Sequence, residues 1–188
     1  SIDDTDLREM LTDINSIDKE AVNRISNIVT SLKKFVRLDE AELQEANINK
    51  ELDLTLELIR HETKNRINVV KDYGEIPSIK CFPNMLNQVF TNILINACQA
   101  IEGNGTITIS TKYQDKKLIV SIKDTGKGIP QNQLSKIFSV GFTTKGIGVG
   151  TGLGLAICSK IIEKHHGEIT VNSKVGKGTE FVITICSE

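Results

Sequence analysis

Four stretches decide the fold of this 188-residue chain: Asn92-Ile-Leu-Ile-Asn96-Ala, Asp124-Thr-Gly-Lys-Gly128-Ile-Pro, Gly150-Thr-Gly-Leu-Gly154-Leu and Gly176-Lys-Gly178-Thr179-Glu-Phe. Any one of them alone indicates little more than a turn, because glycine clusters are first of all turn signals. In this order they predict a helix with paired amides, a strand-end carboxylate backed by glycines, a flexible segment that opens a helix, and a closing glycine turn. Such a set can hold a purine, a magnesium ion and a triphosphate.

The first stretch places two amide side chains on one face of a helix, since Asn92 and Asn96 are four residues apart. An amide oxygen is a neutral, hard ligand, which suits a magnesium ion that phosphates have already neutralised. The alternative is a pair of exposed polar positions, and the presence of the other three stretches favours a binding role.

The second stretch begins where a strand ends, at Asp124. An ionised carboxylate can only accept hydrogen bonds, so it favours the exocyclic amine of adenine over the carbonyl oxygen of guanine. A charge-assisted bond of this kind contributes about 1.5–3 kcal/mol, which is enough to select the base. Gly126 and Gly128 let the backbone pass close to that base. Taken alone, the stretch fits an Asp-Thr-Gly turn without a ligand equally well.

Two other phosphate-binding arrangements are excluded. Gly152-Leu153-Gly154 lacks the third glycine of a dinucleotide-binding fingerprint, does not directly follow a strand, and has no parallel unit around it. The chain also has no Gly-Lys-Ser/Thr phosphate loop. The helix that begins at this point offers free N–H groups, which favour anionic oxygens.

Together with Phe138 and Phe142, the four stretches resemble the N box, G1 box, F box, G2 box and last glycine turn of sensor histidine kinases. The resemblance covers about residues 48 to 188. It implies an α+β fold, a two-layer α/β sandwich of the histidine kinase, gyrase and chaperone ATPase type, with ATP and Mg²⁺ as ligands. By this resemblance Asn96 is the magnesium ligand, and Asn92 supports the side of the metal-bound water or the phosphoacceptor.

The same resemblance makes residues 138 to 151 a lid over ATP, with Lys145 as its one cation and the contact for the γ-phosphate. Glycines make the lid flexible enough for a gating role. Thr179 would join the adenine network around Asp124. The catalytic residues implied are Asn92 and Lys145, and the nucleotide contacts implied are Asn92, Asn96, Asp124, Gly126, Gly128, Ile129, Phe138, Thr144, Lys145, Gly150, Thr151, Gly152, Leu153, Gly154 and Thr179.

One position departs from the family pattern. Many relatives carry a basic residue three positions past Asn96, where this chain has Gln99. Lys145 is therefore left with more of the phosphate charge.

Hydrophobic periodicity predicts the elements around these stretches. We expect antiparallel hairpins with helices on one face of a single sheet. Helices are expected over 49–60, 83–101, 131–138 and 153–165, and strands over 67–73, 106–113, 117–123, 168–173 and 179–186.

A long amphipathic helix is expected ahead of this domain, because apolar residues from Leu7 to Phe35 recur every three or four positions. It resembles the second helix of a dimerisation hairpin, so we divide the chain into residues 1–38 (that helix), 39–47 (a hinge) and 48–188 (the catalytic ATP-binding domain). A helix that packs on its own domain is the alternative. The chain opens without an initiator methionine, so we expect a fragment of a larger, homodimeric protein.

The three histidines are not expected to accept phosphate. His61-Glu-Thr-Lys-Asn65 imitates the phosphoacceptor box, but Arg66 replaces its proline and a strand follows at once. His165 and His166 close a helix, where cations are favourable. The acceptor histidine is expected on a helix missing from this sequence, so the fragment should bind ATP without phosphorylating itself.

Composition excludes several other classes. The net charge of −1 gives no nucleic-acid footprint, and no apolar run approaches the roughly 18 residues of a membrane span. Three of the four cysteines lie in apolar runs, which indicates buried free thiols in a reducing compartment. We expect a cytoplasmic location, possible membrane anchorage only through missing upstream segments, and a response regulator as partner.

Three alternative functions stay open. An anti-sigma-factor-type serine kinase has the same ATPase fold but generally lacks a long dimerisation helix. A clamp ATPase of the gyrase, mismatch-repair or chaperone kind needs a large downstream domain. A module that senses ATP without phosphoryl transfer is the non-enzymatic alternative.

Overall fold

A computed structural model describes the chain at residue 22 and over residues 42–143 and 152–186. The helix expected over 5–38 and the site residues Thr144, Lys145, Gly150 and Thr151 lie outside this range. The elements in chain order are β1 (Gln44–Ala46), α2 (Ile48–Leu58), α3 (Arg60–Thr63), β2 (Ile67–Tyr73), β3 (Ile79–Cys81), α4 (Pro83–Ala100), β4 (Gly105–Gln114), β5 (Lys117–Asp124), α5 (Gln131–Leu134), α6 (Gly154–Lys164), β6 (Gly167–Lys174) and β7 (Gly178–Cys186).

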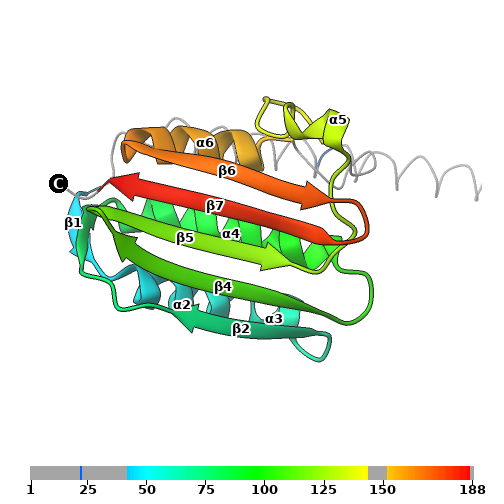
Figure 1. The fold of residues 1–188 in the computed structure, drawn as a ribbon, viewed down its shortest axis with the longest axis horizontal. Coiled ribbons are helices and arrows are strands. Elements are labelled where there is room, and N and C mark those ends of the chain that lie inside the picture. Colours follow the sequence, from blue (N-terminus) through cyan, green and yellow to red (C-terminus); the bar gives the residue numbers. More distant parts are fainter. Residues whose placement is uncertain (1–21, 23–41, 144–151, 187–188) are drawn as a thin grey trace, which may run out of the picture.

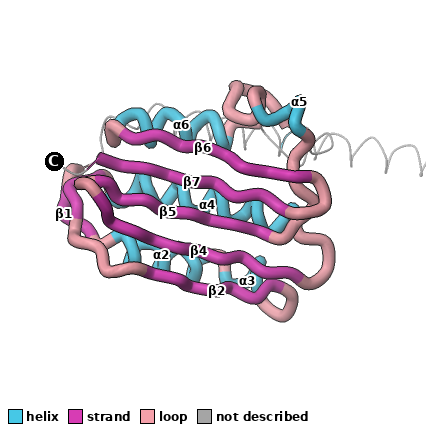
Figure 2. The backbone as a smooth tube through the Cα atoms, in the orientation of Figure 1, coloured by secondary structure: helices cyan, strands magenta, loops and turns pink. Residues whose placement is uncertain are grey.

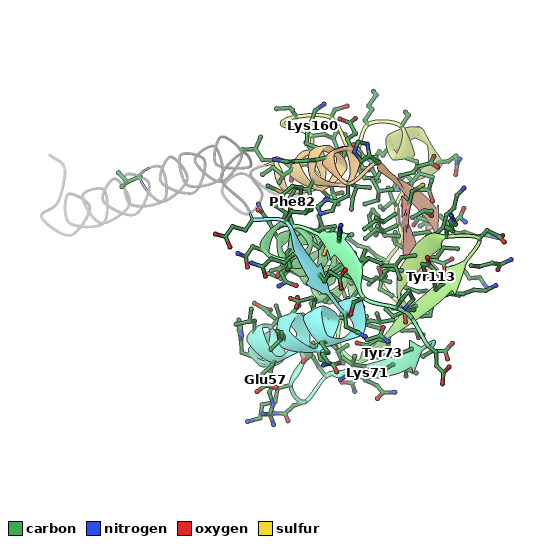
Figure 3. All side chains as sticks on the ribbon, turned by 90° about the vertical axis from the view of Figure 1, so that its left-hand side faces the viewer. Glu57, Lys71, Tyr73, Phe82, Tyr113 and Lys160 are labelled. Atoms are coloured by element: carbon green, nitrogen blue, oxygen red, sulfur yellow. The ribbon has the colours of Figure 1, made fainter. Side chains whose placement is uncertain are left out.

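The described part of the chain forms two layers. Five strands make one sheet in the order β2-β4-β5-β7-β6. Helices α2, α4 and α6 lie side by side behind that sheet (Figure 1), and the view turned by 90° shows them on one side of it (Figure 3). This arrangement confirms the expected α+β sandwich with helices on a single face.

The sheet is mixed, which corrects the expectation of antiparallel hairpins alone. β2 pairs with β4 in parallel, from Ile67 opposite Gly105 to Tyr73 opposite Thr111. The other neighbouring pairs are antiparallel. The chain between β2 and β4 contains α4, and a helix of this kind is the usual connection that returns a strand in the same direction.

A second, two-stranded sheet was not expected. β1 pairs antiparallel with β3, with Gln44 opposite Cys81 and Ala46 opposite Ile79. β1 lies within residues 39–47, the stretch expected as a hinge. Figure 2 shows β1 at the left-hand end of the molecule, where β4 ends and β5 begins. The expected helix over 131–138 is also shorter, since α5 ends at Leu134.

The hydrophobic core lies between the central helix and the sheet. The buried side of α4 consists of Met85, Leu86, Val89, Phe90, Ile93, Leu94, Ala97 and Cys98. It faces the buried positions of β4, β5 and β7, which alternate along each strand as a one-sided sheet requires. Because each fully buried aliphatic side chain contributes about 1.5–3 kcal/mol, this packing fixes where the polar side of α4 points.

Arg66 anchors the carboxyl end of α4. Its guanidinium donates to the carbonyl oxygens of Cys98 and Ile101, both at 2.9 Å. A cation that bonds the last carbonyls of a helix is favourable there because those groups lack partners within the helix. The arginine that breaks the imitation phosphoacceptor box therefore has a structural role.

Cysteine burial agrees with the sequence. Cys81, Cys98 and Cys158 are buried free thiols, whereas Cys186 is exposed at the end of β7. Burial raises the pKa of Cys158 to about 12, so its thiol stays protonated. None of the helices in the described part of the chain is long and apolar enough to cross a membrane.

Candidate nucleotide-binding site

The polar side of α4 meets the start of α6 through Asn92. Its Nδ2 donates to the carbonyl oxygen of Gly154 at 3.2 Å, and it lies 3.7 Å from the Sγ of Cys158. A carbonyl can only accept, so this contact fixes the orientation of the amide. The Oδ1 atom of Asn92 accepts no hydrogen bond from the described residues, which leaves an oxygen for a ligand. Asn96 is half-buried one turn further along the same helix.

Asp124 ends β5 and has one occupied and one unoccupied oxygen. Its Oδ1 accepts from the backbone N–H of Gly126 at 2.7 Å and of Thr179 at 3.3 Å. Its Oδ2 accepts no hydrogen bond from any residue within 42–143 or 152–186. The side chain is 3% exposed. Burial raises the pKa of Asp124, and the two backbone hydrogen bonds oppose that rise. A buried carboxylate with a free oxygen suits a ligand that brings its own donor.

Glycine lets the loop after Asp124 rest on the end of α4. A Cβ at Gly126 would lie 2.6 Å from the carbonyl carbon and oxygen of Ala100, closer than real Cβ atoms come. The next residue, Lys127, donates its N–H to that same oxygen at 2.9 Å. These contacts hold the loop after Asp124 against the carboxyl end of α4, the helix that also carries Asn92 and Asn96.

The closing turn between β6 and β7 packs on the same loop. Gly128 and Gly178 both have positive φ, 73° and 98°, which favours glycine. A Cβ at Gly128 would collide with the carbonyl of Lys174, and one at Gly178 with the carbonyl of Asp124. The second and fourth sequence stretches therefore form one packed unit.

Ser173, at the end of β6, is a functional candidate that the sequence did not indicate. Its hydroxyl accepts from the N–H of Ile129 at 2.8 Å, donates to the carbonyl of Gly178 at 2.9 Å, and lies 2.9 Å from the Oγ1 of Thr179. It belongs to none of the four stretches. A polar side chain just before a glycine turn was the signal that could have found it.

The two ends of the expected lid are joined. The N–H of Gly141 donates to the carbonyl of Gly152 at 3.0 Å, and a Cβ at Gly152 would lie 2.6 Å from the oxygen of Gly141. Phe138 is half-buried and meets Phe181 edge to face, with 6.4 Å between ring centres. Phe142 packs against the core from the near end. Both phenylalanines therefore contact the hydrophobic core.

Some of the remaining site residues expected from the sequence lie within the described range, and others do not. Ile129, Leu153 and Gly154 lie on the elements described above and are half-buried. Gln99 is exposed on α4. The lid residues Thr144, Lys145, Gly150 and Thr151 are outside the described range, so the site is built here without them.

The histidines differ from expectation in one respect. His61 is exposed on α3 beside Glu62, and His166 is exposed at a φ of 52°. His165 is buried at 6% exposure, and burial lowers its pKa. Its Nε2 accepts from the N–H of Phe82 at 3.0 Å, so Nδ1 carries the proton towards the carbonyl of Ile161 at 2.8 Å. The interpretation of His165 as a helix-terminal cation was wrong, because the ring is neutral.

Comparison with known proteins agrees with this geometry. The family model described as the histidine kinase-, DNA gyrase B- and HSP90-like ATPase matches residues 82–188. The chain belongs to this ATPase family. Within it, the relatives are sensor histidine kinases, and the chain has the catalytic domain of that type.

Three relatives illustrate the likeness. The sensor histidine kinase ZraS of Escherichia coli (strain K12) is 35% identical over 167 residues, 88% of this chain and 35% of that protein. The nucleotide-free catalytic domain of histidine kinase ThkA is 32% identical with a TM-score of 0.71, covering 78% of this chain and 96% of that one. ThkA in complex with the response regulator TrrA is 28% identical with a TM-score of 0.72, covering 89% and 49%. This chain spans about a third of the length of ZraS.

Proposed function

We propose that this chain is the ATP-binding kinase core of a two-component sensor histidine kinase, and that it transfers the γ-phosphoryl group of ATP to a histidine outside this sequence. The observation that carries the proposal is Asp124. The two backbone donors that the described residues supply both go to its Oδ1, and its Oδ2 is left for the exocyclic amine of a purine. Membership of the ATPase family and the sensor-kinase names of its relatives support the same conclusion.

The phosphates are assigned to residues on α4 and at the start of α6, two helices that Asn92 connects. Asn96 is the proposed magnesium ligand. The Oδ1 atom of Asn92, which accepts no hydrogen bond within 42–143 or 152–186, is proposed to lie on the side of the phosphoacceptor. Bound there, Mg²⁺ would neutralise phosphate charge. Lys145 is the proposed cation at the γ-phosphate, and the N–H groups at the start of α6 favour anionic oxygens.

Catalysis in this proposal rests on positioning and charge. Asp124 orients the base, and the amide face of α4 orients the phosphate chain relative to it. The loop, the closing turn and the end of α4 are packed together, so the distance between the two ends of the ligand is set by the fold. Preorganised placement of this kind supplies much of the rate enhancement in phosphoryl transfer. The nucleotide contacts proposed are the fifteen residues named from the sequence, from Asn92 to Thr179.

The domain division and the partners belong to the proposal. Residues 1–38 would form the second helix of a dimerisation hairpin, residues 39–47 its connection, and residues 48–188 the catalytic domain. The whole protein would be a homodimer, located in the cytoplasm or attached to the cytoplasmic side of a membrane. ThkA is solved with the response regulator TrrA, which supports a response regulator as partner here. The serine kinase alternative is disfavoured, since the relatives compared are sensor histidine kinases.

The test uses γ-labelled ATP. The chain alone should bind ATP but gain no acid-labile phosphate, because His61 is held on α3 and His165 is buried against Phe82. Addition of a protein that carries the acceptor helix should produce acid-labile label on that added protein. Label on His61 in the chain alone would contradict the proposal, as would transfer to serine.

A further inference from the structure

The Ser173 hydroxyl has one proton and contacts three polar groups. The chemistry of these groups determines which atom donates in each hydrogen bond. The backbone N–H of Ile129 is a donor, so it uses a lone pair of the Ser173 hydroxyl. The carbonyl of Gly178 can only accept, so it takes the single Ser173 proton. What remains on Ser173 is a second lone pair.

The orientation of the Thr179 hydroxyl follows from this count. Thr179 Oγ1 lies 2.9 Å from Ser173 Oγ, and either oxygen could donate by distance alone. Because the Ser173 proton is already committed to Gly178, the hydrogen bond forms when Thr179 donates. Thr179 is 4% exposed, so water does not compete freely for that proton. Its hydroxyl then presents lone pairs alone to a ligand.

Thr179 and Asp124 are joined, so this restriction acts at the carboxylate. The N–H of Thr179 donates to Asp124 Oδ1 at 3.3 Å, while Asp124 Oδ2 stays available. Two neighbouring groups thus offer acceptors, and neither offers a donor. A purine amine complements such a pair, and a purine carbonyl at the same position is repelled by it.

We propose that Ser173 is a specificity-determining, positioning residue, which orients the Thr179 hydroxyl as an acceptor beside Asp124 and so selects a 6-amino over a 6-oxo purine nucleotide. This inference rests on the proposed nucleotide function. Ser173 acts through Thr179 and need not touch the ligand. Without its hydroxyl, Thr179 can turn its proton towards a carbonyl at position 6.

The test compares ADP with IDP, whose bases differ by the amino or oxo group at position 6 and by the N1 proton that the oxo form carries. Titration calorimetry gives the ratio of the two dissociation constants, Kd(IDP)/Kd(ADP), for the natural chain and its variants. Ser173→Ala should lower this ratio roughly three- to tenfold, the worth of one neutral hydrogen bond. Ser173→Thr keeps the hydroxyl and should keep the ratio. In a Thr179→Val background, Ser173→Ala should change the ratio no further, since the hydroxyl it orients is gone.

Each result of these titrations either supports or contradicts the proposed role of Ser173. An equal weakening of ADP and IDP by Ser173→Ala would mean that Ser173 only braces the Ile129 loop, and it would overturn the proposal. So would an undiminished effect of Ser173→Ala in the Thr179→Val background. If Ser173→Ala fails to fold, Thr179→Ser should keep the ratio and Thr179→Val should lower it, and equal ratios in those two variants would overturn the proposal. A natural chain that binds neither nucleotide, or that binds both equally, contradicts the base contact of Asp124 on which the proposed function rests. A selective natural chain whose Kd ratio is unchanged by Ser173→Ala refutes this inference alone.

Discussion

At the scale of single residues, the two oxygens of Asp124 have different partners, and this asymmetry sharpens what a substitution would do. Asp124→Asn keeps an oxygen for the N–H groups of Gly126 and Thr179, which can only donate. The new NH₂ must then occupy the place of Oδ2 and would face the purine amine donor to donor. We expect a folded variant whose ADP affinity falls by roughly 10- to 100-fold, the loss of one charge-assisted hydrogen bond.

Titration calorimetry with ADP measures that loss. Asp115→Asn is the matched control, because Asp115 is exposed in the turn between β4 and β5 at a φ of 53°, which asparagine tolerates. Natural affinity in the Asp124→Asn variant would refute the assignment of this carboxylate to the base.

His165 predicts a pH dependence of stability. Burial lowers its folded pKa below the unfolded value of about 6.5, with Lys164 and His166 acting in the same direction. The folded state binds fewer protons, so stability is fully present above pH 6.5 and falls as the pH drops below it. The chain should therefore be less stable at pH 5.5 than at pH 7.5.

Urea denaturation at pH 7.5 and 5.5 checks this expectation. His61→Gln should retain the pH dependence, because His61 is exposed, whereas His165→Gln should lack it. A pH-independent free energy of unfolding in the natural chain would show that His165 does not control it.

At the scale of elements, the end of α4 depends on a residue far from it in the sequence. Arg66→Met should lower the free energy of unfolding by about 1–3 kcal/mol, because the carbonyls of Cys98 and Ile101 lose a charged donor. Arg60→Met is the control, since Arg60 is exposed and lies 3.4 Å from Glu57 in a surface ion pair worth well under 1 kcal/mol. Urea denaturation compares the two, and equal losses would contradict a capping role for Arg66.

Some elements could be predicted from the sequence more reliably than others. The apolar stripe and the amide pair of α4 were predictable because an 18-residue helix repeats its period several times. β4 and β5 alternate over eight or more residues and were equally clear. β1 and β3 have three residues each, too few to show a period, and the parallel pairing of β2 depends on where α4 packs.

The candidate site was predictable where it relies on local chemistry and obscure where it relies on contacts between distant segments. Asp124, Gly126 and Gly128 were indicated by their own neighbours in sequence. Ser173 was not, because its role exists only once β6 and β7 bring it to Thr179 and the loop at Ile129 arrives from 44 residues away. Burial of His165 likewise depends on Phe82, which is 83 residues distant.

At the scale of the whole molecule, a bound nucleotide should stabilise the entire fold. The proposed site joins β5, the turn between β6 and β7, and the end of α4, so unfolding any of them releases the ligand. ADP at 100 times its dissociation constant should raise the free energy of unfolding by about 2.7 kcal/mol, since it binds the folded state alone.

Thermal denaturation with and without ADP shows the effect as a rise in Tm of roughly 5–11 °C for a chain of this size. The Asp124→Asn variant supplies the control and should show a much smaller rise. An equal rise in both proteins would place the nucleotide elsewhere.

The backbone hydrogen bond between Gly141 and Gly152 affects how far the number of residues between them can change. It brings together two residues that have ten residues between them in the sequence, and joining the ends of a segment of that length has an entropic cost. That cost grows slowly with length, by about 0.6 kcal/mol for each doubling. A change in the number of residues between Gly141 and Gly152 therefore adds little closure entropy, so the length of this segment can differ while the hydrogen bond that joins its flanks is kept.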